Sequence, residues 1–158
     1  MPFRAPQIGA ALAVVLGALA AFVGQASADA VYHSQHIPLD VVEGAPLRSG
    51  FVENIHPNGP QVFAHEVYVL NGASPDTAYQ VTLLVYADDP TCSTEPVAGG
   101  IDTAVLTTNG KGNGRADAFL APEDIPAFLR DGTHGVAWEL TTNGTLAYRT
   151  GCSSVTLD

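Results

Sequence analysis

Five Asn-Gly dipeptides divide the chain into short segments, and no other feature constrains its fold as much. Both residues tolerate a positive φ, so this pair is the strongest short-range signal for the tight turn of a β-hairpin. We therefore expect an antiparallel β structure with turns at the dipeptides that begin at Asn58, Asn71, Asn109, Asn113 and Asn143.

The segments between these turns alternate with a period of two, as half-buried strands do. In 79–86 one face holds Tyr79, Val81, Leu83 and Val85, and we predict that this face is buried. In 61–70 the more apolar face holds Phe63, His65, Val67 and Val69, which predicts that His65 is a buried, hydrogen-bonded core residue. Tyr68 and Tyr86 fall on the opposite faces of their strands, and Trp138 is predicted to anchor the core.

Further strands are expected at 31–38, 103–108, 115–120, 135–142, 145–149 and 154–157, whereas 43–60 is predicted to be a long irregular connection. About seven or eight short strands with turns between them favour an immunoglobulin-like antiparallel β-sandwich. The segment 122–130 starts with proline and two acids and is followed by Gly132, which predicts one short helix. Pro126 lacks an amide donor, so a pair of 3₁₀ turns is the alternative there.

The first 28 residues have the three parts of a signal peptide. Arg4 supplies the positive start, 8–23 is apolar, and Ala26-Ser27-Ala28 has the small-x-small form that signal peptidase cleaves. The apolar run is shorter than the roughly 20 residues of a membrane-spanning helix, so cleavage is favoured over an uncleaved anchor. We predict a secreted, extracellular or cell-envelope protein with one domain at 29–158, and cleavage after Ala30 is an alternative start.

The charge of the mature domain is strongly negative. All 16 acidic residues follow the leader together with five of the six basic residues, so the formal charge after cleavage is −11. Such a surface repels nucleic acid and anionic lipid, which argues against both as partners.

The two cysteines, Cys92 and Cys152, both lie in the predicted mature domain. In an exported chain they are expected to form one structural disulfide. The alternatives, a C-x-x-C redox centre or a thiolate metal site, need spacings that this sequence does not have.

The order Pro-x-Thr-x-Tyr-x-Val at 75–81 resembles the tyrosine corner of fibronectin type III and related immunoglobulin-like domains. The resemblance implies that the hydroxyl of Tyr79 bonds back to the chain just upstream. The segments 106–117, 138–140 and 147–158 also resemble uncharacterised exported bacterial proteins. That resemblance implies a fold and a compartment but no activity, because fold analogy does not carry function.

Histidines give the strongest chemical lead, since neutral imidazole is the commonest protein ligand for copper and zinc. A sandwich could gather three of the four that lie early in the mature chain, which are His33, His36, His56 and His65. Cleavage after Ala30 would also place His33 third from a free amino terminus, where it could bind Cu(II).

No motif for nucleophilic catalysis or for a bound cofactor is present. The acid pairs Asp88-Asp89 and Glu123-Asp124 are interpreted as solvated or capping groups. We therefore expect a non-catalytic module that binds an extracellular protein or glycan. A copper or zinc protein is the first alternative, and a small extracellular hydrolase, which would need two carboxylates within about 10 Å in a cleft, is the second.

Overall fold

The computed structural model describes residues 31–42, 44–58, 64–97 and 99–157. The predicted signal peptide and both predicted cleavage points lie outside these residues. Within them, no helix has the length and apolar character needed to cross a bilayer.

The described chain is all-β and antiparallel, as predicted. Its nine strands are β1 (Val31–Val41), β2 (Ser49–Asn58), β3 (Ala64–Asn71), β4 (Ala78–Tyr86), β5 (Ile101–Thr107), β6 (Gly114–Leu120), β7 (Gly132–Thr142), β8 (Thr145–Thr150) and β9 (Ser153–Leu157).

Two short 3₁₀ helices connect β6 to β7, which are η1 (Pro122–Asp124) and η2 (Ala127–Leu129). Of the two structures expected for 122–130, the pair of turns is therefore the right one. Pro126 separates them because it cannot donate an amide hydrogen bond to a continuing helix. The Ala121 amide donates to Asp124 Oδ2 over 3.0 Å, so Asp124 caps η1 as the sequence predicted.

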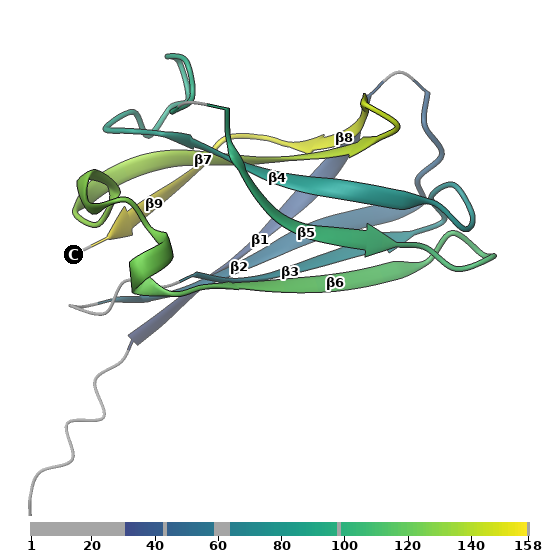
Figure 1. The fold of residues 1–158 in the computed structure, drawn as a ribbon, viewed down its shortest axis with the longest axis horizontal. Helices are drawn as coiled ribbons and strands as arrows, with labels where there is room; N and C mark the ends of the chain where they lie inside the picture. Colours follow the sequence, from purple (N-terminus) through teal and green to yellow (C-terminus); the bar gives the residue numbers. More distant parts are fainter. Residues whose placement is uncertain (1–30, 43, 59–63, 98, 158) are drawn as a thin grey trace, which may run out of the picture.

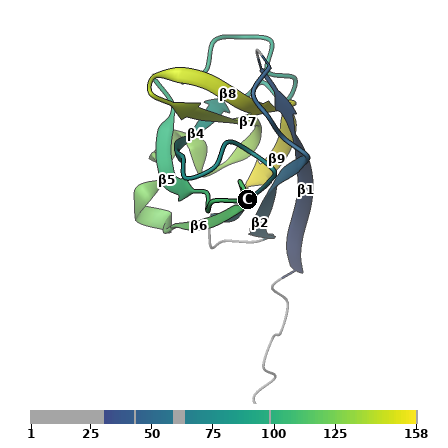
Figure 2. The same cartoon turned by 90° about the vertical axis from the view of Figure 1, so that its right-hand side faces the viewer.

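The strands follow the order β5-β4-β7-β8-β1-β2-β3-β6, and β9 pairs with the first half of β7. Figure 1 shows two facing layers, with β1, β2, β3 and β6 in one and the remaining strands in the other. The two end strands, β5 and β6, lie beside each other (Figure 2).

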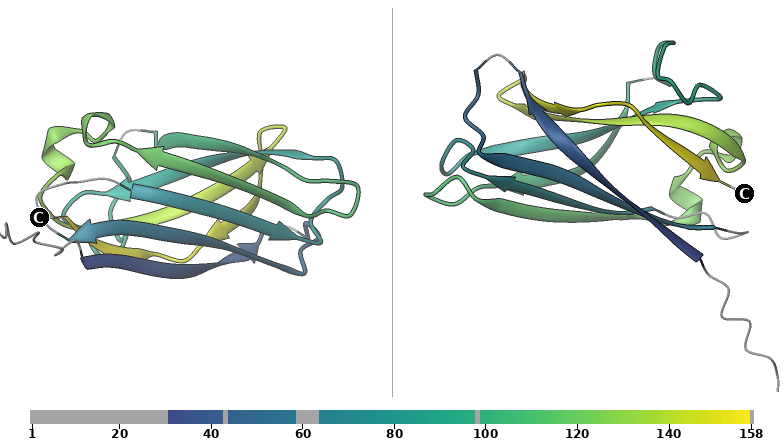
Figure 3. Two further views of the ribbon diagram at one scale, coloured as in Figure 1. Left: turned by 90° about the horizontal axis from the view of Figure 1, so that it is seen from below. Right: turned by 180° about the vertical axis from the view of Figure 1, so that it is seen from behind.

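Strand β1 joins the layers, and this makes the sheet a flattened, nearly closed barrel rather than two separate sheets. Its residues up to Pro38 pair with β2, and Leu39–Val41 pair with β8. Figure 3 shows β1 running diagonally from one layer to the other.

The prediction of an irregular connection at 43–60 is wrong, because β2 is a central strand between β1 and β3. Its inward residues are Val52, Asn54 and His56, all buried. Two of these three are polar, so the alternation that normally reveals a half-buried strand is hidden in the sequence.

The sequence predicted the wrong buried face for β3, because the face with His65, Val67 and Val69 is the outer one. Glu66 is 1% exposed, and Tyr68 and Leu70 are fully buried, whereas His65 is half-buried on the outer face. A shift of one residue moves every side chain of a strand to the other face, and the pairing of β3 with β2 and β6 fixes this register.

The predictions for β4 and β7 are confirmed. Tyr79, Val81, Leu83 and Val85 are buried, and Trp138 is 1% exposed in the core. The Tyr79 hydroxyl differs from the expected tyrosine corner: it lies 3.4 Å from the Tyr148 hydroxyl, which donates to the Pro46 carbonyl over 2.7 Å.

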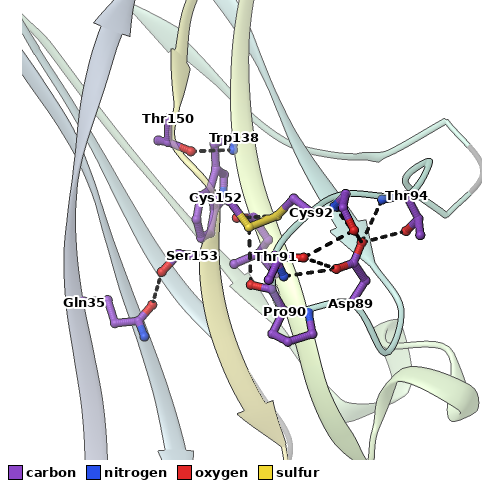
Figure 4. The surroundings of a disulfide bond; sticks show 12 residues. Gln35, Asp89, Pro90, Thr91, Cys92, Thr94, Trp138, Thr150, Cys152 and Ser153 are labelled. Atoms are coloured by element: carbon purple, nitrogen blue, oxygen red, sulfur yellow. Dashed lines mark hydrogen bonds between the residues drawn. A yellow bond between two sulfur atoms is a disulfide. The ribbon is translucent and has the colours of Figure 1, made fainter.

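Cys92 and Cys152 form a disulfide with their Cα atoms 5.9 Å apart, as predicted (Figure 4). It joins the β4–β5 loop to the short connection between β8 and β9. Gly135 allows the loop to pack closely over β7, since a Cβ there would lie 2.3 Å from the Asp89 carbonyl and 2.7 Å from Cys92 Sγ.

The Asp89 carboxylate organises the same loop. It accepts hydrogen bonds from the amides and hydroxyls of Thr91, Ser93 and Thr94. The Thr91 hydroxyl makes the largest contribution to holding the pKa of Asp89 far below its usual range. Asp89 is thus a capping acid, as the sequence predicted.

Candidate functional site

A polar row crosses the inside of the barrel. In the pairing of β1, β2 and β3, Gln35 lies opposite Asn54, and Asn54 lies opposite Glu66. Gln35 Nε2 donates to the Ser154 carbonyl over 2.9 Å, and its Oε1 accepts from the Ser153 hydroxyl over 2.7 Å. Gln35 therefore links β1 to β9, while Asn54 and Glu66 are left to line the interior.

Glu66 is the centre of a buried hydrogen-bond network that links three strands. Its Oε2 accepts from the Tyr68 hydroxyl and, over 3.0 Å, from Trp138 Nε1–H on the opposite layer. The Tyr68 hydroxyl also lies 2.6 Å from the Thr103 hydroxyl on β5. This network holds the Glu66 carboxyl in one place and ties the two layers together.

The environment of Glu66 favours the protonated acid. Burial raises the pKa of Glu66, and the hydrogen bonds from Tyr68 and Trp138 only partly offset this effect. Burial and the neighbouring Glu66 carboxylate raise the pKa of the Tyr68 phenol as well. Glu66 and Tyr68 are therefore both uncharged at pH values below the raised pKa of Glu66.

Glu66 lies in the wall of a cavity of about 70 Å³ at one end of the barrel. Most of the lining consists of aliphatic side chains from β4, β5, β6, β7, β9 and the crossover that contains η1 and η2. Among them are Leu83, Leu120, Leu129 and Val155. The crossover thus covers a space that is apolar except for a few polar groups.

Asn54 is the most unusual of these polar groups. Its side chain is 3% exposed, and its Oδ1 has no hydrogen-bond partner among the described residues. An unsatisfied buried amide oxygen costs about 1–3 kcal/mol, so such groups are rare in folded proteins.

His134 also lines the cavity, but its bonds are structural. The Asp88 amide donates to Nδ1 over 3.1 Å, so Nδ1 must be the acceptor nitrogen, and Nε2–H then donates to the Asp131 carbonyl over 3.1 Å. The ring is neutral in this arrangement, and it ties the β4–β5 loop to the start of β7.

The four histidines considered as candidate metal ligands do not converge. His33 and His56 lie opposite each other, with ring centroids 5.4 Å apart and nearly parallel planes. His36 lies 3.0 Å from Glu53 on the outer face, and His65 is also outside. In the part of the chain that the structure describes, no three or more His, Cys, Asp or Glu side chains form a group that could hold a metal.

His33 and His56 instead line a surface groove of about 240 Å³ between β1 and β9. His56 also lines the inner cavity.

Sequence analysis did not identify Asn54, Glu66 or Tyr68 as site residues. Their only signal is the spacing of two residues between Glu66 and Tyr68, which places both on one face of a strand. Asn54 lies opposite Glu66 only because of the register between β2 and β3, and the sequence does not show this register.

Comparison with known proteins adds no assignment: the chain matches no protein-family model, no curated protein and no solved structure.

Proposed function

We propose that this protein is an exported, non-catalytic binding module whose ligand occupies the cavity beside Glu66. The observation that carries the proposal is the cavity itself, an almost wholly apolar space whose wall includes the buried Glu66 side chain. Apolar pockets with a few convergent polar groups and a perturbed pKa are the usual form of a small-molecule site.

We also propose that the flattened barrel is an immunoglobulin-like sandwich with one added strand. Strands β8, β7, β4 and β5 have the connectivity of the G-F-C-C′ sheet of such domains, and β2, β3 and β6 have that of A-B-E. In this interpretation β1 is the additional strand, and it bridges the two sheets by pairing with β2 and β8.

Export is supported by the leader-like first 28 residues and by the disulfide. Cys92 and Cys152 are bonded, and such bonds persist mainly in oxidising compartments outside the cytoplasm.

The cavity is better suited to holding a ligand than to reacting with it. Its described lining contains one carboxyl group, Glu66, and no Ser, Thr, Cys or Lys side chain. Its volume of about 70 Å³ also favours a small organic molecule over a protein segment or a glycan chain. Typical pockets for drug-sized ligands measure roughly 300–1,000 Å³.

Trp138 makes the proposal testable, because it is the single tryptophan of the chain and its indole N–H contacts Glu66. We expect n-butanol or n-butylammonium to shift the indole N–H resonance of the mature protein in a saturable manner. The variant Ala64→Leu, which adds bulk to the cavity wall, should abolish this shift while its other resonances keep the wild-type dispersion. Absence of a shift with both molecules, or an equal shift in Ala64→Leu, would overturn the proposed site.

A further inference from the structure

The outer face of the layer that contains β4, β7 and β8 carries a cleft of about 330 Å³. Ala137 on β7 is a small residue in this cleft, and the larger Leu84 lies opposite it on β4. The Cys92–Cys152 disulfide forms another part of the lining and packs closely on β7, since a Cβ at Gly135 would lie 2.7 Å from Cys92 Sγ. The cleft is therefore bounded by hydrogen-bonded strands and a cross-linked loop.

Three charged side chains of the lining lie in one row. Glu139 on β7 is opposite Arg149 on β8, and Arg149 is opposite Asp40 on β1. Directly opposite residues of neighbouring strands share a face, with Cβ atoms about 4.5–5.5 Å apart. The row is on the outer face, because residues next to these three in the chain, such as Leu39 and Leu140, are buried in the core. The register of three strands thus places a guanidinium group between two carboxylates.

These charged groups keep their hydrogen-bonding capacity for a ligand. Among the described residues, the side chains of Asp40, Glu139 and Arg149 have no hydrogen-bond or ion-pair partner. A guanidinium group only donates hydrogen bonds, and an ionised carboxylate only accepts them. The cleft therefore presents donors and acceptors side by side, and a ligand that has both kinds of group complements it.

We infer that this cleft binds a neutral saccharide, whose hydroxyl groups bond to the row formed by Asp40, Arg149 and Glu139. This site lies on the outer face of the barrel and goes beyond the proposed function of the inner cavity. Each hydroxyl both donates and accepts, so neighbouring hydroxyls of one sugar can donate to a carboxylate and accept from Arg149. The half-buried ring of Tyr86 also lines the cleft and offers an aromatic surface to the apolar face of a sugar ring.

Charge and volume favour this ligand class. Two carboxylates and one guanidinium leave the row with a net negative charge, and the chain as a whole carries −10, so phosphate and carboxylate ligands are repelled. Arg149 in turn disfavours a simple cation. A water-sized sphere needs roughly 10–15 Å³ by the same measure, so about 330 Å³ accommodates roughly 20–30 non-hydrogen atoms, as in a disaccharide.

The test titrates cellobiose, maltose and N,N′-diacetylchitobiose into the disulfide-bonded mature protein. The backbone amide resonances of Ala137 and Gly151 report on the cleft, because both residues line it. We expect at least one of the three disaccharides to shift them in a saturable manner. Arg149→Ala should weaken that binding at least about tenfold, since it removes charged donors to the ligand.

Arg115→Ala is the matched control, because Arg115 is an exposed arginine on β6 in the opposite layer, and its loss should leave the affinity unchanged. For the aromatic contact, Tyr86→Ala should weaken binding about tenfold, and Tyr86→Phe should keep the affinity within about twofold. No saturable shift with any of the three disaccharides, or equal affinities of Arg149→Ala and the wild type, would overturn the inference. Neither result affects the inner cavity, whose test uses the indole resonance of Trp138.

Discussion

Strands β3 and β4 belong to opposite layers of the barrel and bury opposite kinds of face (Figure 1). On β4 the more apolar face is buried, with Val81 fully inaccessible. On β3 the less apolar face is buried, with Glu66 and Tyr68 inside and Val67 and Val69 only half-buried outside.

The difference shows that the more apolar face of a strand need not be the buried one. A face with polar side chains can be buried instead when hydrogen bonds satisfy those side chains. Glu66 can be inside because Tyr68 and Trp138 both donate to its Oε2. A buried carboxyl without such donors would cost several kcal/mol, whereas a satisfied one can fix a register. The β4 layer therefore supplies apolar packing, and the β3 layer supplies specific polar contacts.

Trp138 connects the two layers, so its replacement should cause the largest loss of unfolding free energy among the variants considered. We expect Trp138→Ala to lower the free energy of unfolding by about 5 kcal/mol, since it removes a buried ring and one donor to Glu66. Urea unfolding followed by circular dichroism measures the loss. Trp138→Phe, which keeps most of the ring but not the N–H, should lose less than half as much. Equal losses in the two variants would show that the indole contact with Glu66, and not packing, dominates.

The disulfide holds the β4 layer, and its removal should have the next largest effect. It closes a loop across a sequence separation of 60, so the double variant Cys92→Ala, Cys152→Ala should lose about 4 kcal/mol of unfolding free energy. Free-thiol labelling of the unfolded, unreduced wild type checks the bond itself and should detect no reactive cysteine. A double variant as stable as wild type would mean that the bond constrains little in the unfolded chain.

Asn54 lies on β2, on the polar side of the barrel, and we expect its replacement by an apolar residue to stabilise the fold. Asn54→Leu should raise the free energy of unfolding by about 1 kcal/mol, because it removes an unpartnered buried oxygen and fills part of the cavity. The mirror change on the apolar layer, Val81→Asn, should be destabilising in the same urea titration. A clear loss of stability in Asn54→Leu would mean that the amide has a partner in solution.

Replacement of His65 tests the register of β3 and should cause the smallest change in the free energy of unfolding. Since this side chain is half-buried on the outer face, His65→Thr should change the free energy of unfolding by less than about 0.5 kcal/mol. A loss of several kcal/mol would instead place His65 inside and restore the alternative register.

Much of the fold follows from local signals in the sequence. The Asn-Gly turns at 109–110 and 143–144 and the apolar faces of β4 and β7 predict an antiparallel β domain with Trp138 in its core. Proline at 126 likewise predicts a broken helix, which the structure contains as η1 and η2.

The candidate site could not be predicted in the same way, because it depends on contacts between distant residues. The neighbours of Glu66 are Asn54 across one strand pair and Trp138 across the barrel. No periodicity within β2 or β3 reveals them, since polar residues inside a strand weaken the alternation that identifies its buried face.

The most direct test of the account is the pH titration of Glu66, read through the Trp138 indole N–H resonance. We expect a titration midpoint above 4.5, the ordinary value of a glutamate pKa, because the side chain is buried. In that case the folded state binds the proton more tightly than the unfolded state. The contribution of Glu66 to the free energy of unfolding is then fully present below pH 4.5 and is lost as pH rises through the folded pKa, and Glu66→Gln should remove this contribution. A midpoint at or below 4.5, or the same pH dependence in Glu66→Gln, would contradict the account.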